Sequence, residues 1–399
     1  MRRWIGSAAW FAIAALAVAA QAPSAASGWQ RDERGAKATA LAQAVTAHVD
    51  DPSAVYYNPA ALAFVRERAF YVGFSLSHGA EAGFVGADPV PGAGVTGERT
   101  MEPRARPHLY WVEPVARRWA IGLALTQSAG FETEWKRPDG WAGRFEARKA
   151  ELRAWDLDAV ASVKVGAALG LSAGVVIRAS TFDWRYDEGA VIVDLRSRSE
   201  IDVGGVLALQ HHPPGRWSWG LRWRGGVSSE FDGGAAFAGG QPLSWTTRLQ
   251  MPDRITLGVA YAPTPTARLE IDLDRTGWAS IGDLDIRFTG QPTLDRTPLS
   301  GWRDRTATRI GLRWYGLGNG EWRAGLSWDP TPQPESDLGP FFVGADRIGA
   351  SIGYGTRVRR LQTDMALVWE EHETRSTSTH GFDGEYETRL LRLVLSFGW

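Results

Sequence analysis

From Ala69 to the last residue, apolar and polar side chains alternate with a period of two, and no other feature constrains the fold as strongly. Ile310, Leu312 and Trp314 alternate with Arg309, Gly311 and Arg313, and the chain ends on Leu391, Leu393, Leu395, Phe397 and Trp399 separated by polar or small residues, Val394 excepted. Successive side chains of a strand point to opposite faces. The pattern therefore predicts antiparallel strands with one dry and one polar face.

Two observations favour a membrane barrel over a soluble sandwich. The polar face carries small Gly, Ser and Ala residues among Arg and Asp, which is typical of a barrel lumen. Tryptophan is abundant, with 20 residues in 399, and several fall at the ends of the apolar face, where aromatic girdles meet lipid headgroups. They are Trp119, Trp155, Trp217, Trp322 and Trp328. We therefore predict an all-β transmembrane antiparallel β-barrel over 66–399, with about fourteen or fifteen strands and an even number expected.

The N-terminus has the organisation of a secretory signal peptide over 1–26. Arg2 and Arg3 form its charged part, and Trp10–Ala20 forms an apolar stretch that is too short to span a bilayer. We place cleavage after Ala26, and an uncleaved anchor is the alternative. The formal net charge of −1 provides no basic stripe for nucleic acid, and the lack of cysteine excludes thiol chemistry.

A compact element is predicted between this leader and the first strand. Asp51–Phe64 reads D-P-S-A-V-Y-Y-N-P-A-A-L-A-F, in which Asp51-Pro52 and Asn58-Pro59 are turn dipeptides. Tyr56 and Tyr57 can pack between the two turns. The alanine-rich segment before it favours a short helical or irregular structure.

This element resembles the plug, or hatch, of the FadL-type family of outer-membrane transporters of long-chain fatty acids and other hydrophobic compounds. Gly28-Trp29-Gln30 stands where that family usually has Gly-Phe-Gln, and Asp329-Pro330-Thr331-Pro332 is similar to a later family motif. The resemblance implies a plug over 27–65 inside a barrel of fourteen strands. It also implies passive, non-enzymatic uptake in the outer membrane of a Gram-negative bacterium, by capture in an apolar cleft, plug-gated passage and lateral exit.

The resemblance further implies the residues of the site. Trp29 is expected in the ligand pocket, and Asn58, Pro59 and Ala60 are expected to contribute to gating. Lateral exit in the family uses a kinked third strand, which corresponds here to Trp119–Gly130, and Gly122 and Gly130 are the expected places for a break in pairing. The expected partners are the hydrophobic substrate, outer-membrane lipid and, through Phe397-Gly398-Trp399, the barrel-assembly machinery. No cofactor, metal or catalytic residue is expected.

Other motifs have structural interpretations. The G-x-G-x-x-G match at Gly92–Gly97 lacks a flanking strand and helix, and the G-x-S-x-G match at Gly170–Gly174 lies inside an alternating strand. His211 and His212 would face opposite sides of a strand and could not both bind one metal. Seven arginines are predicted to face the lumen as ion pairs, with carboxylate binding by one or two as the alternative. They are Arg222, Arg224, Arg309, Arg313, Arg323, Arg347 and Arg392.

Two other functional classes are alternatives to hydrophobic uptake. A water-filled porin for polar solutes would require an unplugged lumen and no apolar cleft. A barrel enzyme such as an outer-membrane lipase would require a serine and a histidine on one lumen-facing patch, and the sequence offers no such pair.

Overall fold

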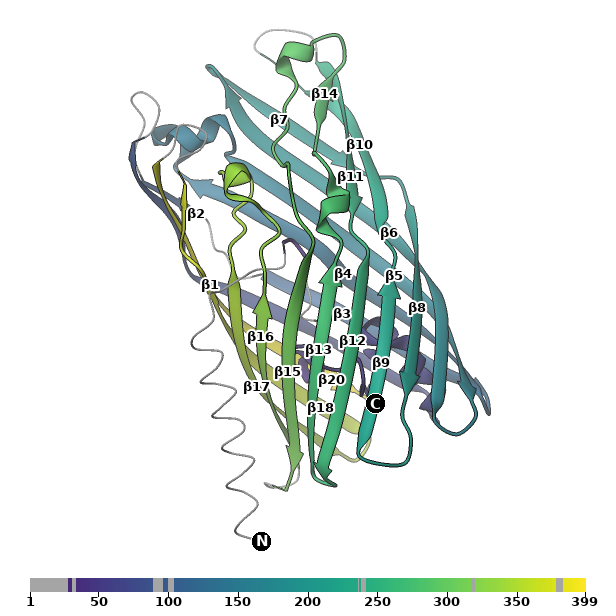
Figure 1. The fold of residues 1–399 in the computed structure, drawn as a ribbon. Helices are drawn as coiled ribbons and strands as arrows, with labels where there is room; N and C mark the ends of the chain where they lie inside the picture. Colours follow the sequence, from purple (N-terminus) through teal and green to yellow (C-terminus); the bar gives the residue numbers. More distant parts are fainter. Residues whose placement is uncertain are drawn as a thin grey trace.

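A computed structural model describes residues 28–30, 34–88, 96–99, 104–235, 237, 242–316, 320–377 and 383–399 of the chain. The predicted signal peptide and most of the Gly92–Gly97 motif lie outside these residues. Figure 1 shows that β-strands make up almost the whole fold. Among the described residues, no helix has the length and apolar character needed to cross a membrane.

Within the described residues, fourteen antiparallel strands close into one ring. In ring order they are β1 (Ala69–Asp88), β3 (Arg104–Ala116), β4 (Trp119–Lys136), β5 (Lys149–Val165), β6 (Leu169–Glu188), β8 (Asp202–His211), β9 (Trp217–Arg224), β12 (Arg254–Thr264), β13 (Ala267–Thr276), β15 (Arg305–Tyr315), β16 (Gly320–Asp329), β17 (Arg347–Val358), β18 (Leu361–His372) and β20 (Asp383–Gly398). The seam between β1 and β20 runs from Tyr71 opposite Gly398 to Asp88 opposite Asp383. The predicted barrel is therefore confirmed.

The two ends of the barrel differ. At one end the chain makes short turns at 117–118, 166–168, 265–266 and 359–360, and there β1 begins and β20 ends. All the longer connections lie at the other end, at the top of Figure 1. In outer-membrane barrels the short turns face the periplasm. We therefore take the short-turn end as periplasmic and the long-loop end as extracellular.

Shorter strands and helices lie at the long-loop end and in the plug. The strands β2 (Thr96–Arg99), β7 (Val191–Arg198) and β19 (Arg375–Thr377) pair with extensions of β1, β6 and β20. A separate three-stranded sheet of β10 (Val227–Ala235), β11 (Leu243–Met251) and β14 (Ile286–Phe288) stands above the barrel (Figure 1). The helices are α2 (Ala36–Thr39), α3 (Ala54–Tyr57), η1 (Pro59–Phe64), η2 (Pro138–Gly140), η3 (Ala142–Phe145), η4 (Trp278–Ile281), η5 (Pro292–Leu294) and η6 (Glu335–Asp337).

Some strands are longer than their residue composition suggests. The stretches Ala80–Pro103 and Phe131–Ala150 look like long loops because they are rich in turn-forming residues. Instead, β1 extends to Asp88 and β4 to Lys136. The ladder continues at the long-loop end because neighbouring strands pair with β1 and with one side of β4, which outweighs the weak strand propensity of individual Gly or Asp residues.

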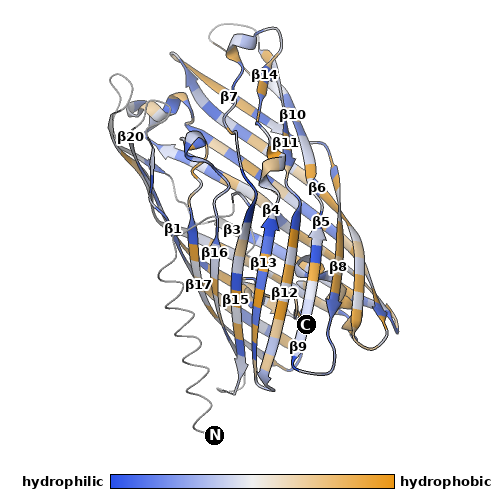
Figure 2. Cartoon of the chain, viewed as in Figure 1, coloured by the Kyte–Doolittle hydropathy of each residue, from blue (hydrophilic) through white to orange (hydrophobic). Residues whose placement is uncertain are grey.

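The alternation has the predicted sense. On β12 and β13, Ile255, Leu257 and Leu273 are exposed on the outer surface, whereas Thr256 and Asp272 are buried inside. Figure 2 shows this alternation of apolar and polar residues along the strands. An apolar outer surface is what a lipid-embedded barrel requires, and ring closure leaves no unpaired edge over most of the wall.

The plug lies inside the lumen, and the glycines of the polar face explain how it fits. The backbone around Leu41 and Ala42 packs on Gly311 and Gly325, and that around Thr46 packs on Gly220. A β-carbon at Gly311 would lie 3.0 Å from the carbonyl oxygen of Leu41. The small residues on the lumen face are therefore positions where a second backbone approaches closely.

The lumen arginines are buried, and six of the seven lie within ion-pair distance of carboxylates. Arg224 pairs with Asp156 and Asp158, Arg309 with Asp274 and Asp329, Arg313 with Asp50 and Glu321, Arg323 with Glu321 and Asp364, Arg347 with Asp329 and Glu370, and Arg392 with Glu370. Arg222 instead donates hydrogen bonds to the carbonyl of Tyr56 and the hydroxyl of Thr256, both at 2.9 Å. Buried charges need such partners. The predicted ion-paired lumen is thus present.

Candidate functional site

Buried apolar side chains pack into one cluster between the plug and the long loops, and we call this cluster the apolar chamber. Its residues come from the N-terminal end of the plug, from strand ends, from the three-stranded sheet and from the loops at 277–304 and 330–346. Its larger side chains are Trp29, Phe131, Leu152, Phe182, Trp184, Phe231, Trp245, Leu249, Met251, Trp278, Ile281, Leu284, Ile286, Phe288, Leu299, Trp302, Phe341 and Phe342. Sites for apolar small molecules have this kind of lining.

Trp29 fills part of this chamber with its own side chain. The indole is 1% exposed, and its ring centroid lies 4.6 Å from that of Trp302 and 5.7 Å from that of Phe131. Its Nε1 donates to the sulfur of Met251 at 3.1 Å. Trp29 thus packs inside the apolar chamber, and its role in ligand binding stays a prediction.

The wall of the barrel is interrupted beside the chamber. The pairing of β4 with β3 ends at Thr126 opposite His108, and β4 pairs on that side again only at Trp135, opposite Arg99 of β2. Among the described residues, 127–134 have no strand partner on that side. On the other side, β4 stays paired with β5 through a bulge that leaves Ser128 out of register. A bulge of this kind bends a strand.

Residues near the N-terminus of the plug cover this interruption from the inside. Gln30 forms an antiparallel bridge with Ala129, the amide of Gly130 donates to the carbonyl of Trp29 at 2.9 Å, and Arg34 Nη2 donates to the carbonyl of Ser128. We call Gly28, Trp29, Gln30 and Arg34 the strap. The strap is anchored by an indole in the chamber and by its bonds to β4.

The two glycines expected at the break behave differently. Gly130 lies in the interrupted stretch and has a φ of 149°, which L side chains rarely adopt. Gly122 is paired on both sides, with Val112 and Val160. The prediction of a break at Gly122 is therefore wrong. That glycine makes room for the plug instead, since a β-carbon there would lie 2.8 Å from the side chain of Leu62.

The Asn58-Pro59 turn forms as expected but contacts other strands. The side-chain oxygen of Asn58 accepts from the amide of Ala60 at 3.1 Å, and its Nδ2 donates to the carbonyls of Thr46 at 2.6 Å and Leu209 at 3.2 Å. The carbonyl of Pro59 accepts from the Ser162 hydroxyl at 2.6 Å. The turn thus packs on β5 and β8, away from the interruption. A gating role for Asn58, Pro59 and Ala60 stays a prediction.

Sequence reasoning missed Gln30, Arg34 and Ser128, the polar residues that join the strap to β4. Gln30 belongs to the predicted Gly28-Trp29-Gln30 motif and could have been singled out with Trp29. No sequence signal marks Ser128, because its place in the bulge depends on strand register.

Two carboxyl groups sit in the loops around the chamber. Asp337 Oδ2 accepts from the indole Nε1 of Trp302 at 2.7 Å, and burial raises the pKa of Asp337 to about 6. Burial, with a smaller contribution from the charge of Asp337, raises the pKa of Glu146 to about 8. Both groups therefore hold a proton more readily than a solvated carboxyl does.

The other motifs occupy structural positions. Ser172 of the G-x-S-x-G match lies within the continuous pairing of β6 with β5 and donates to the carbonyl of Ala161 at 2.8 Å. His211 packs against Trp219, whereas His212 stacks on His48 of the plug with ring centroids 5.1 Å apart. In the part of the chain that the structure describes, no group of three or more His, Cys, Asp or Glu residues could hold a metal ion.

Residues 15–183, which include the plug and the interrupted strand, match the model of a family described as outer membrane protein transport protein (OMPP1/FadL/TodX). This part of the chain is therefore similar to that family. A curated relative, the long-chain fatty acid transport protein of Salmonella typhi, is 22% identical over 287 residues, which are 62% of this chain. The match spans 65% of that relative's length.

Solved structures show the same fold over nearly the full length. A Pseudomonas aeruginosa FadL homologue superposes with a TM-score of 0.81 at 18% identity, covering 94% of this chain and 99% of that one. The Pseudomonas putida toluene transporter TodX gives a TM-score of 0.71 at 16% identity, with 93% and 99% covered. The Ralstonia pickettii toluene transporter TbuX gives 0.67 at 16% identity, with 91% and 97% covered.

Proposed function

We propose that this chain mediates passive uptake of hydrophobic small molecules, long-chain fatty acids or similar compounds, across the outer membrane of a Gram-negative bacterium. One observation carries the proposal: the apolar chamber adjoins the interruption in β4, and the strap occupies both. A solute that replaces Trp29 in the chamber would leave sideways into the bilayer once the strap moves. It would thereby avoid the charged lumen below, and no catalysis or cofactor is involved.

The filled lumen supports this function over that of a porin. The plug residues from Ala36 to Ala47 are nearly all buried against the wall. Two cavities next to Gln30 have volumes of only about 10 and 30 Å³, room for about one or two water molecules. A polar solute would have to displace the plug, whereas an apolar solute would have to displace only the strap.

The relatives support the substrate class. The curated relative is named for long-chain fatty acids, and two of the superposing structures are toluene transporters. The names share an apolar cargo rather than one headgroup, which agrees with a chamber lined by aromatic and aliphatic side chains.

A reversible disulfide between the strap and β4 tests this function. Gln30 and Ala129 are bridge partners, and such pairs have α-carbons about 4.5–5.5 Å apart, which is within the range of a disulfide. The chain has no cysteine of its own. We therefore expect Gln30→Cys with Ala129→Cys to abolish uptake of a hydrophobic substrate when oxidised and to restore it on reduction.

Each single-cysteine variant is the matched control and should transport under both conditions. Full uptake by the oxidised double variant, with the disulfide verified by mass spectrometry, would disprove lateral exit past the strap. Uptake of a small sugar by the reduced protein would instead favour the porin.

A further inference from the structure

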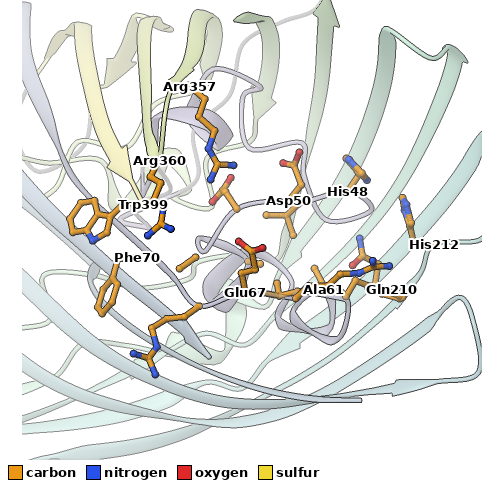
Figure 3. Close-up of a pocket in the computed structure, with 18 residues that line it drawn as sticks. His48, Asp50, Ala61, Glu67, Phe70, Gln210, His212, Arg357, Arg360 and Trp399 are labelled. Atoms are coloured by element: carbon orange, nitrogen blue, oxygen red, sulfur yellow. The ribbon is translucent and has the colours of Figure 1, made fainter. Parts of the chain in front are cut away.

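A large cavity opens below the plug at the short-turn end, and the transport path does not use it. Its volume is about 920 Å³, within the range of ligand-binding sites. Figure 3 shows its lining, with Ala61 of the plug and Gln210 of β8 on one side and Arg357, Arg360 and Trp399 on the other. We call this cavity the vestibule.

The mouth of the vestibule carries an excess of positive charge. Among the described residues, no carboxylate lies within ion-pair distance of Arg66, Arg357 or Arg360, and all three line the cavity and are exposed. Arg68 is neutralised by Glu113. Glu67 is the one acid among the described residues of the mouth that has no ion pair, so the charges there do not cancel.

The acids deeper in the vestibule offset only part of this excess. Asp50 lies 2.8 Å from Lys37 Nζ and 3.1 Å from Arg313 Nη1, so it is already compensated. Asp51 accepts a hydrogen bond from the amide of Ser53 at 2.7 Å but has no ion pair among the described residues, so Asp51 and Glu67 are two acids against three arginines. The guanidinium groups at the mouth therefore remain available to an anion from outside the protein.

One edge of the vestibule opens onto the membrane surface. Phe70 and Trp399 line the cavity, yet they are 37% and 55% exposed on the outer, lipid-facing surface. Their rings stack with centroids 6.1 Å apart across the seam between β1 and β20. A molecule in the vestibule could thus place a charged group among the arginines and an apolar chain along these two rings.

We propose that the vestibule binds an anionic phospholipid of the periplasmic leaflet. The phosphate would be held by Arg66, Arg357 and Arg360, because a guanidinium donates two parallel hydrogen bonds to phosphate oxygens. The acyl chains would lie outside the barrel against Phe70 and Trp399. Such a lipid would bridge the first and last strands, where the ring closes.

Native mass spectrometry of the purified, detergent-solubilised protein tests this proposal. The protein is mixed with equal amounts of dioleoylphosphatidylglycerol, dioleoylphosphatidylethanolamine and oleate. We expect one phosphatidylglycerol to be retained, with at least tenfold weaker retention in the triple variant Arg66→Gln, Arg357→Gln, Arg360→Gln.

The matched control removes the same charge from the same end of the barrel, outside the vestibule. Arg117, Arg118 and Arg216 are exposed at two other short turns, and changing all three to glutamine should leave retention unchanged. Equal loss in both triple variants would overturn the proposal, because it would indicate attraction to the whole basic rim. Preferential retention of oleate would also overturn it, because the ligand would then be a cargo-like fatty acid.

A variant with the opposite expected effect excludes misfolding as an explanation. Glu67→Gln removes the acid at the mouth and should tighten phosphatidylglycerol retention severalfold. Weaker or unchanged retention in Glu67→Gln would count against electrostatic recognition in the vestibule.

Discussion

Replacing Trp29 with alanine should release the strap from the interruption in β4. The indole is 1% exposed, and truncating a buried Trp or Phe to Ala costs about 3–5 kcal/mol. The other bonds of the strap that the structure describes are the Gln30–Ala129 bridge, the Gly130 amide bond and the contacts of Arg34. A loss of about 3 kcal/mol, at 1.4 kcal/mol per factor of ten, should raise the open fraction on the order of 100-fold.

A single thiol can measure this opening. The chain has no cysteine, and Ser128 lies under the strap at 5% exposure, so Ser128→Cys introduces one thiol that is covered when the strap is closed. If closing is fast relative to labelling, the rate of modification by a small maleimide follows the open fraction. In the Ser128→Cys background, Trp29→Ala should therefore be labelled on the order of 100-fold faster.

Trp245→Ala in the same background is the matched control. It removes a fully buried indole from the same chamber, but Trp245 lies on β11 rather than on the strap. Labelling in this control should stay close to that of the parent. An unchanged rate in Trp29→Ala would refute the role of the indole as the anchor, and equal acceleration in both variants would mean that any loosening of the chamber exposes Ser128.

Three further outcomes are expected. Asn58→Ala with Pro59→Ala removes three hydrogen bonds of the Asn58 side chain, each with a net value of about 1 kcal/mol. This double variant should lower uptake of a hydrophobic substrate while a heat-modifiable barrel still assembles. Unchanged uptake at matched expression would contradict the gating role of the turn. Trp399→Asp, or deletion of Phe397 to Trp399, should reduce the amount of assembled barrel in the outer membrane because these residues pair and stack at the seam; normal membrane levels would contradict this. Burial raises the pKa of both Asp337 and Asp346 to about 6, above the usual 3.8, so packing of the loop at 330–346 should be strongest below about pH 4 and weaken as the pH rises through 6. Protease nicking of the loop should be faster at pH 7.5 than at pH 5, and Asp337→Asn should reduce the difference.

The wall of the barrel could be predicted from the sequence because its determinants are local. The alternation of apolar and polar residues within each strand determines which side chains face the lumen and which face outward. The lumen glycines and arginines lie on the predicted face. Burial in a low-dielectric interior requires partners for those charges, so ion pairing follows from the lumen assignment. The turn at Asn58 was predictable for the same reason, since Asn bonds its own backbone two residues on.

The interruption in β4 could not be placed from local sequence. Gly122 and Gly130 are equivalent as residues in one strand, but the first faces Val55 and Leu62 of the plug and the second takes a positive φ next to a bulge. The difference arises from register with β3 and β5 and from a strap that lies about one hundred residues away in the sequence. The extended length of β1 and β4 is likewise set by their neighbours.

The way the plug is bonded indicates which part of it moves. Asp272 accepts hydrogen bonds from the amides of Val45 and Thr46 at 3.1 and 3.0 Å, and Glu270 accepts from Ala47 at 2.5 Å. A hydrogen bond contributes about 1 kcal/mol net. Expelling the plug would also separate the buried Asp50 from Lys37 and Arg313, which leaves a buried charge without partners.

The strap has fewer bonds to break. Its described polar contacts with β4 are the Gln30–Ala129 bridge, which includes the bond from the Gly130 amide to the Trp29 carbonyl, and the bond from Arg34 to the Ser128 carbonyl. Its main anchor is an apolar side chain, whose contacts an apolar solute can replace. A solute entering the chamber thus supplies the contacts that the indole gives up, whereas nothing apolar can replace the carboxylates that hold the plug. Under the proposed function, opening would therefore need the least free energy at the strap, and an apolar solute would lower that free energy while a polar solute would not.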